Sequence, residues 1–264
     1  MLRRADEPNP SAPPVQRLRV RYAKRGKLRF TSHRDVARAF ERALRRAAVP
    51  MAYSHGFNPH PRISWVGAAP TGAASEAEYV EIAVITELDP TELAHALDAA
   101  LPPGLDIQEV LVARPGSLAD RIEASHWRIE VPGVDPDTLA AAVRELLVAE
   151  AVEVEKMTKN GPRRIDVRPA IVSLRVRTAA PYGILEAVVR QTSPVVRPDD
   201  VLNALRVVAA LTPPAPAKAT RMAQGRLDDN GLVSDPLAPD RGLPATEAGE
   251  PESGQRVVVE GSVG

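Results

Sequence analysis

The sequence predicts an α+β protein. Short segments in which apolar and polar residues alternate with a period of two, as in half-buried strands, are separated by segments with apolar residues at helical spacing. The order strand–helix–strand–strand–helix–strand can be traced over residues 16–115 and again, with an extra hairpin, over residues 123–227. We therefore expect two tandem ferredoxin-like (βαββαβ) modules.

The first predicted strand covers residues 16–23. Apolar residues from Leu18 to Tyr22 share one face, and the arginines between them share the other. This is the alternation of a strand with one buried face. We expect the arginine face to be open to solvent or to a ligand. In a rival interpretation, Arg19 pairs with Glu81 across neighbouring strands, as a surface ion pair that contributes about 0–1 kcal/mol.

A helix is predicted to begin after Ser32 and to run to residue 47. Ser32 and Asp35 have the spacing of a capping box, with Asp in place of the usual Glu or Gln. Val36, Phe40 and Leu44 recur at helical spacing and form the side that we expect to be buried.

The other elements follow from the same two periodicities and from proline and glycine breaks. In the first half we predict strands at 63–66, 77–85 and 105–113 and a helix at 90–101. In the second half we predict strands at 126–131, 152–157, 163–167, 171–178, 184–191 and 218–227 and helices at 136–149 and 198–211. Residues 1–15 are rich in proline, and the acidic tail 228–264 lacks an apolar pattern, so both are predicted to be disordered.

Composition excludes several classes of protein. The chain has no cysteine, which removes disulfides, thiolate nucleophiles and cysteine-ligated clusters. Residues 1–15 lack the apolar core of a signal peptide, and no apolar run is long enough to span a membrane. We expect a cytoplasmic protein, and we assign it no cofactor and no metal.

Charge is distributed in blocks, although the chain as a whole is neutral. Residues 17–62 contain thirteen Lys or Arg and two acidic residues, a net charge of +11. Residues 63–113 contain nine acidic residues and no Lys or Arg. A basic block of this size favours a polyanionic partner, most commonly nucleic acid. The acidic block 76–109 is the natural docking face if the protein is instead an adaptor between proteins.

The predicted helix carries a second, basic stripe of four arginines at steps of four, four and three. Only 3% of the chain is aromatic, so we expect contacts with phosphates rather than stacking with bases. The predicted nucleic-acid-binding residues lie on the first strand, this helix, the loop 53–62 and the second half: Arg17, Arg19, Arg21, Lys24, Arg25, Lys27, Arg34, Arg38, Arg42, Arg45, His55, Asn58, His60, Arg62 and Arg168.

Three histidines in the basic block, His33, His55 and His60, are the candidates for chemistry. A histidine beside a basic cradle can act as a general acid or base in RNA cleavage, as in ferredoxin-like CRISPR RNA endonucleases. As metal ligands they would need a further ligand such as Asp35 or Glu78, and their spacing matches no familiar zinc pattern.

Several motifs resemble those of a known bacterial family. They are RFTSHRD at 29–35, FERALRRA at 40–47, YSHGFNPHPR at 53–62, SEAEY at 75–79 and, more weakly, IDVRP at 165–169 and ATR at 219–221. These motifs resemble the radical-SAM-linked (radical-SAM-associated) proteins, a domain of unknown function. The resemblance covers residues 15–226 and is specific in the first hundred residues.

Some members of that family carry a radical S-adenosylmethionine module, which this chain lacks. Without cysteine, the chain cannot hold the cluster of a radical-SAM enzyme. The resemblance implies a partner or substrate-presenting subunit, and genes of this type often neighbour ribonuclease genes. We expect a non-catalytic, RNA-binding accessory protein in RNA modification or processing, with a radical-SAM enzyme or a ribonuclease in trans. A metal-independent RNA endonuclease and a protein–protein adaptor are the alternatives.

Overall fold

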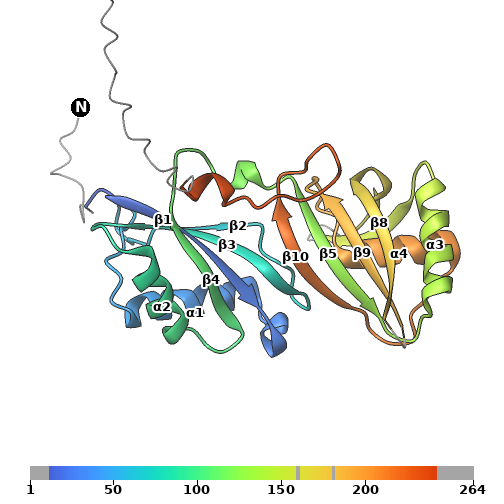
Figure 1. Ribbon diagram of the computed structural model, residues 1–264, viewed down its shortest axis with the longest axis horizontal. Coiled ribbons are helices and arrows are strands. Elements are labelled where there is room, and N and C mark those ends of the chain that lie inside the picture. Colours follow the sequence, from blue (N-terminus) through green and yellow to red (C-terminus); the bar gives the residue numbers. More distant parts are fainter. Residues whose placement is uncertain (1–11, 159–160, 180–181, 243–264) are drawn as a thin grey trace, which may run out of the picture.

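The computed structural model describes residues 12–158, 161–179 and 182–242. It is a mixed α+β structure with four α-helices and one large mixed sheet, as the sequence predicts (Figure 1). Most of the predicted disorder falls on residues 1–11 and 243–264, which lie outside the described residues. Within the described residues, no helix has both the length and the apolar character needed to cross a membrane.

The first half contains four strands and two α-helices. In chain order they are β1 (Gln16–Lys24), α1 (His33–Arg46), β2 (Ile63–Val66), β3 (Ala74–Val84), α2 (Pro90–Ala100) and β4 (Leu105–Val112). The strands lie in the order β4-β1-β3, and β2 pairs with β3. All of these pairs are antiparallel.

The second half contains six strands and two α-helices. They are β5 (Ala124–Val131), α3 (Pro136–Val148), β6 (Glu153–Thr158), β7 (Gly161–Asp166), β8 (Ile171–Ala179), β9 (Tyr182–Arg190), α4 (Pro198–Ala209) and β10 (Lys218–Gly225). The order in the sheet is β10-β5-β9-β8, and β6 pairs with β7 in a separate two-stranded sheet. The extra hairpin predicted from the sequence is β6–β7.

The two halves share one sheet. β10 pairs in parallel with the beginning of β3, where Thr220 is opposite Ala74 and Arg221 is opposite Ser75. The path β4-β1-β3-β10-β5-β9-β8 is therefore continuous. We call the place where β3 and β10 meet the seam.

Local sequence explains why these elements form. Ser32 caps α1 by accepting a hydrogen bond from the Asp35 N–H, and its hydroxyl donates to the Asp35 carboxylate. Asp89 and Asp135 cap α2 and α3 in the same way, each followed by a proline in the first helical turn. Proline is tolerated there because these N–H groups have no partner within the helix.

Each half has its own apolar core. In the first half, Tyr22, Phe40 and Trp65 form an aromatic group, with 4.7 Å between the ring centroids of Tyr22 and Phe40 and 5.2 Å between those of Phe40 and Trp65. The larger core of the second half includes Trp127 and Leu205. The cores lie between the sheet and the helices.

The region predicted to be disordered from residue 228 is partly ordered, which corrects that expectation for residues 228–242. Residues 226–241, here called the C-terminal strap, run from the second half of the sheet to the first half, where they lie on the side opposite α1 and α2 (Figure 1). A short helical turn, η5 (Ala238–Asp240), ends the strap, and Leu237 and Asp240 are buried there. The strap is held by two neighbouring apolar side chains, Pro236 and Leu237, and by several ion pairs, which leave no periodic pattern in the sequence.

Candidate nucleic-acid interface

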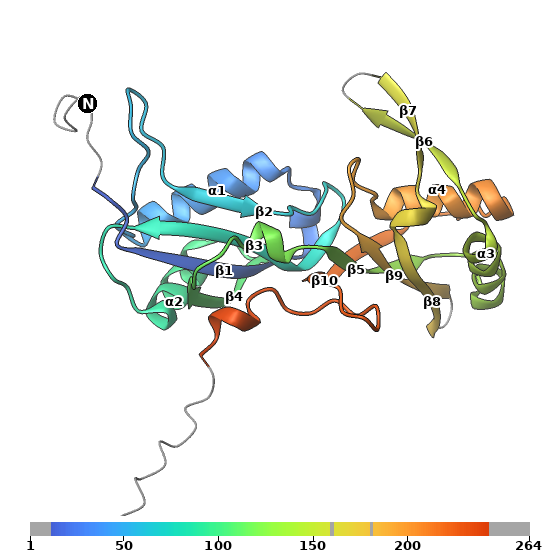
Figure 2. The same cartoon turned by 90° about the horizontal axis from the view of Figure 1, so that it is seen from above.

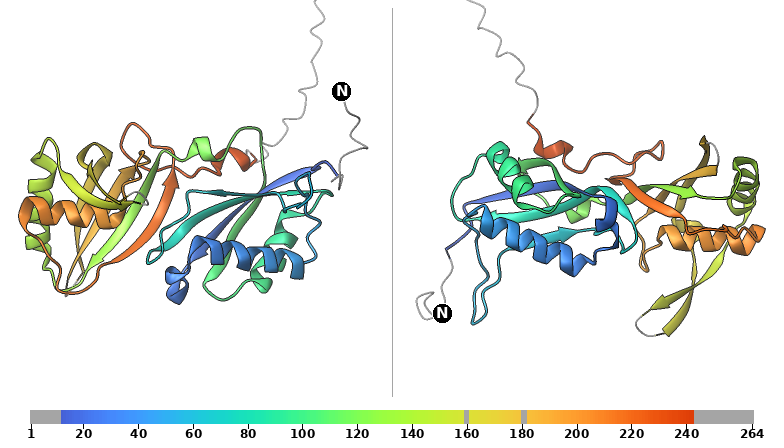
Figure 3. Two further views of the ribbon diagram at one scale, coloured as in Figure 1. Left: turned by 180° about the vertical axis from the view of Figure 1, so that it is seen from behind. Right: turned by 90° about the horizontal axis from the view of Figure 1, so that it is seen from below.

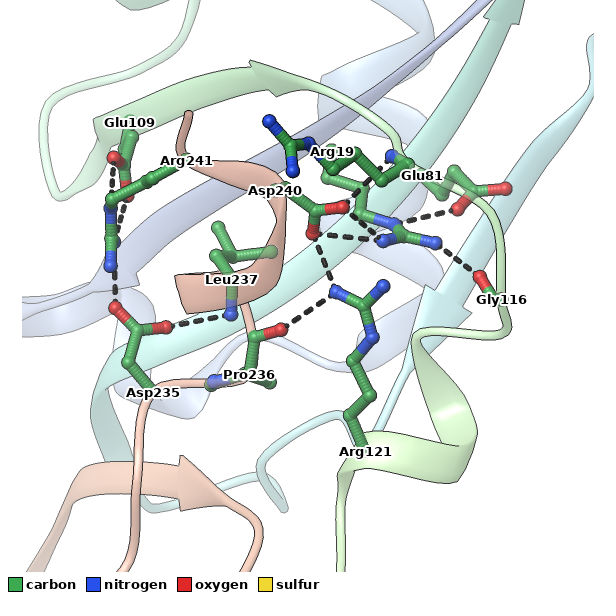
Figure 4. Close-up of polar contacts among 11 residues, drawn as sticks. Arg19, Glu81, Glu109, Gly116, Arg121, Asp235, Pro236, Leu237, Asp240 and Arg241 are labelled. Carbon is green, nitrogen blue, oxygen red and sulfur yellow. Dashed lines mark hydrogen bonds and ion pairs between the residues drawn. The ribbon is translucent and has the colours of Figure 1, made fainter. Parts of the chain in front are cut away.

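The arginine face of β1 is covered by the strap at Arg19. Arg19 lies under the strap, where its Nη1 donates to both carboxylate oxygens of Asp240, at 2.6 and 2.8 Å (Figure 4). Its Nε donates to Glu81 at 3.0 Å. The predicted Arg19–Glu81 pair is therefore present, but only 2% of the Arg19 side chain is exposed. Arg19 cannot reach a phosphate, and this corrects its place among the nucleic-acid-binding residues.

Asp240 is the centre of this network. Besides Arg19, it accepts hydrogen bonds from the Arg121 side chain at 2.7 Å and from the Arg114 N–H at 2.9 Å. Burial alone would raise the pKa of Asp240, but the hydrogen bonds from Arg19, Arg114 and Arg121 outweigh it and hold the pKa below its usual value. The strap is thus fastened by an ionised, buried carboxylate.

Apart from the exposed Lys27, the other predicted basic residues of β1 and the turn after it also contact groups of this chain. Arg17 pairs with Glu81 at 3.3 Å, and Arg21 donates to the Glu76 carbonyl. Arg25 pairs with Glu76 and Asp106. Lys24 is buried, and its ammonium donates to the carbonyls of Ala69 and Pro70. Like Arg19, Lys24 is therefore removed from the surface that can meet a ligand.

The same contacts neutralise much of the acidic block. Glu76, Glu81 and Asp106 pair with arginines of β1 and the following turn, and Glu109 pairs with Arg241 of the strap. These carboxylates are occupied within the chain. The acidic block therefore offers less free charge to a protein partner than its sequence indicates.

The arginines of α1 behave differently. Arg34, Arg38, Arg42 and Arg45 are all exposed. Arg38 lies 3.7 Å from Asp35, and the described part of the chain places no carboxylate within ion-pair distance of the other three. Four arginines at these spacings extend along about 16 Å of helix. Their charge is therefore available to a ligand.

The loop after α1 forms a projecting finger, residues 53–61. Tyr53 pairs with Pro61, the Ser54 N–H donates to the His60 carbonyl at 2.8 Å, and the Ser54 hydroxyl accepts from the His60 N–H at 3.0 Å. Arg62 closes the base by donating to the Tyr53 carbonyl at 3.1 Å. His55, Phe57, Asn58 and His60 are exposed along the finger.

The hairpin β6–β7 forms a second projection. Figures 2 and 3 show the finger and the hairpin extending on the same side of the molecule, with α1 between them. Arg163 and Arg164 are exposed on the hairpin, and 74% of Met157 is exposed. The exposed face of α1, together with the exposed Lys27, forms the basic side of the protein, because the exposed acidic side chains of the hairpin offset its two arginines.

The three histidines considered for chemistry lie on two elements. His33 is exposed at the start of α1, with its ring centroid 5.2 Å from that of Trp65, while His55 and His60 lie on the finger. Across the residues that the structure describes, no group of three or more His, Cys, Asp or Glu side chains could hold a metal. Glu78, considered as a further ligand, is buried beside Arg221 at the seam.

Arg168 has a structural role. Its guanidinium donates to the Ile171 carbonyl at 3.2 Å and to the Leu147 carbonyl, near the end of α3, at 3.1 Å. These bonds hold the chain after β7 against the end of α3 and the beginning of β8.

Sequence analysis missed one group on the sheet of the second half. His126 Nε2 lies 2.6 Å from Glu186 Oε2, and Arg175 and Arg177 lie beside this pair in a hollow of about 410 Å³ that also borders the strap. Arg128 is exposed on the neighbouring strand, directly opposite Glu186. The residues come from three strands and the strap, so only the register of the sheet brings them together.

These features define an α+β protein with a stripe of exposed arginines along α1. Residues 17–198 match the family described as an uncharacterized protein conserved in bacteria (DUF2344). The chain belongs to this bacterial family. None of the curated proteins compared with the chain matches it. The family description does not mention radical-SAM enzymes, so that link rests on the sequence motifs alone.

Proposed function

We propose that this protein binds RNA through the exposed face of α1 and the finger 53–61, as a non-catalytic accessory or substrate-presenting subunit. The binding residues are Arg34, Arg38, Arg42, Arg45, His55, Asn58 and His60, with Lys27 and Arg62 at the margins. Arg19, Lys24 and Arg168 are left out because their side chains are used within the fold.

One observation carries this proposal. The arginines of β1 and the following turn meet carboxylates of this chain, whereas three of the four in the α1 stripe meet none among the described residues. Like charges held close together on one helix destabilise it slightly, and a solvated helix face needs no such stripe. An unneutralised stripe of this kind is the footprint of phosphate contacts.

RNA is favoured over other polyanions by the family resemblance, since genes of this type often neighbour ribonuclease genes. The same resemblance supports a radical-SAM enzyme or a ribonuclease acting in trans on the RNA that this protein holds. The enzyme would catalyse the reaction, and this chain would bind the substrate RNA.

The test replaces Arg38, Arg42 and Arg45 with Gln. Helix propensity hardly changes, and stability should move by less than about 0.5 kcal/mol. Affinity for RNA should fall for every sequence alike. In a plot of log affinity against log salt concentration, the slope should shrink by roughly 0.7 per lost contact with single-stranded RNA.

A charge-matched control is available on the sheet of the second half. The triple variant Arg128→Gln, Arg175→Gln, Arg177→Gln removes the same charge from exposed residues away from α1. It should keep the wild-type salt slope. Equal losses in the two triple variants would show that binding follows net charge and would remove α1 as the interface.

We also infer that each half is a ferredoxin-like module. The strand order β4-β1-β3-β2 of the first half supports this inference. The order β10-β5-β9-β8 repeats it in the second half once the β6–β7 hairpin is set aside. In both halves two helices connect the strands in the same sequence, β-α-β-β-α-β.

A further inference from the structure

A cleft of about 630 Å³ lies where the two halves meet. One wall is formed by Arg29, Phe30 and the loop 70–73 of the first half. The other is formed by the beginning of α4, including Asp199, and by the segment that leads to Lys218. A cleft of this volume between two structural units is typical of a ligand site.

The wall from the first half is held rigidly. Arg29 makes two hydrogen bonds with Gly72: its carbonyl accepts from the Gly72 N–H at 2.7 Å, and its Nε donates to the Gly72 carbonyl at 2.7 Å. Gly72 has a positive φ of 96°, a conformation that glycine adopts without strain. The two bonds fix Arg29, and with it the position of Phe30.

Buried ionic groups at the seam hold the same loop from behind. Lys24 donates to the carbonyls of Ala69 and Pro70, and Glu78 accepts from the Ala69 N–H at 3.0 Å. Glu78 is in turn paired with Arg221 of β10. The loop is therefore tied to both halves, so the cleft is formed before any ligand arrives.

Phe30 is the unusual side chain of this wall. It is 68% exposed, although phenylalanine gains most from burial, and the Arg29 guanidinium lies 5.6 Å from its ring centroid. Phe30 lies three residues before the first residue of α1, the helix that carries the arginine stripe. An exposed aromatic ring beside a phosphate-binding face is the arrangement in which single-stranded nucleic acid stacks a base.

We propose that this cleft receives an unpaired base of the RNA, an inference that rests on the proposed function. The base stacks on Phe30, and the Lys218 ammonium meets the adjacent phosphate. Asp199, which is exposed in the cleft, accepts a hydrogen bond from the exocyclic amino group of the base. Adenine, cytosine and guanine carry such a group and uracil does not, so the cleft selects against uracil.

The test compares Phe30→Leu, Phe30→Ala and wild type in binding to single-stranded oligo(A), oligo(C) and oligo(U) and to an RNA duplex of equal length. Phe30→Leu keeps an apolar side chain of similar size and removes the aromatic face. We expect both variants to bind single-stranded oligo(A) about 5- to 100-fold more weakly, and the duplex as wild type does. Equal affinities of Phe30→Leu and wild type for oligo(A) would overturn the stacking role.

Asp199→Ala tests the choice of base separately. The wild type should prefer oligo(A) and oligo(C) to oligo(U), and the variant should lose most of this preference. A wild type that binds all three alike overturns the assignment of Asp199. If the α1 triple variant loses binding while Phe30→Leu does not, the cleft proposal fails and the proposed function stands. If wild type binds no RNA at low salt, both fail.

Discussion

The Nη1 atom of Arg19 lies 2.6 Å from Oδ1 of Asp240, although 221 residues separate them in the chain. The Asp240 carboxylate is fully enclosed and lies between Arg19 and Arg121. The pair joins the first strand of the protein to the last turn that the structure describes.

Removing this carboxylate should destabilise the protein strongly. Asp240→Ala leaves two arginines buried with fewer partners, and breaking a buried ion pair costs about 3–5 kcal/mol. Urea denaturation should show this loss as a lower midpoint. Arg17→Ala is the control, because the Arg17 side chain is largely exposed and its pair with Glu81 should contribute no more than about 1 kcal/mol. Similar losses in both variants would show that the buried network stabilises the protein no more than a surface ion pair does.

Acid should loosen the strap. The pKa of Asp240 is lower in the folded protein than in the unfolded chain, so its contribution to stability is complete above the unfolded value, near pH 4. It is lost as the pH falls through the folded pKa. We expect the stability difference between wild type and Asp240→Asn to be constant near neutral pH and to shrink below about pH 4. Urea titrations at several pH values measure it, and a difference that persists at the lowest pH would contradict the assignment.

Glu78, at the seam, should contribute about as much to the free energy of unfolding as Asp240 does. Its side chain is 3% exposed and pairs with Arg221, whose guanidinium also lies 5.5 Å from the Trp127 ring centroid. Glu78→Ala leaves Lys24 and Arg221 buried without this carboxylate, and we expect a loss of about 3–5 kcal/mol in the free energy of unfolding.

Glu76→Ala is the matched control for the seam. Glu76 lies two residues away on the same strand, and its pair with Arg25 is partly exposed. Its loss should cost no more than about 1 kcal/mol. A Glu78→Ala protein as stable as Glu76→Ala would show that the halves are held together by the strands alone.

Two phenylalanines separate packing from binding. Phe40 is 1% exposed and lies between Tyr22 and Trp65, so Phe40→Ala should cost about 3–5 kcal/mol through the cavity that it leaves. Phe30→Ala, at an exposed position, should change the free energy of unfolding by less than about 0.5 kcal/mol. Thermal or urea unfolding checks both. A large loss of stability in Phe30→Ala would mean that its weaker RNA binding comes from unfolding and not from the lost aromatic ring.

Much of the secondary structure could be predicted because its causes are local. The alternation around Leu18 and Tyr22 predicted β1, and Ser32 marked the start of α1, which the structure confirms. Periodicity and caps act over a few residues, so one sequence contains all that is needed to see them.

Which arginines are buried and which are exposed could not be predicted, because burial depends on contacts between distant residues. Arg19 and Arg38 look alike in sequence, each in a basic run with an apolar stripe beside it. The first is buried by a strap whose docking depends on Leu237 and Asp240, and the second is left exposed. Pairing across the whole chain decides which basic residues can meet a partner.

The position of the strap also determines when the protein can be completed during synthesis. A nascent chain folds from its N-terminal side as it emerges. β1 emerges early, but Asp240, which accepts two hydrogen bonds from Arg19, is added 221 residues later. β10, which links the halves at Ala74 and Ser75, also comes after the other strands. The N-terminal half is therefore finished only after the second half has been made. If a ribosome stalls before residue 240, the strap cannot cover Arg19 on the side of the sheet opposite α1 and α2.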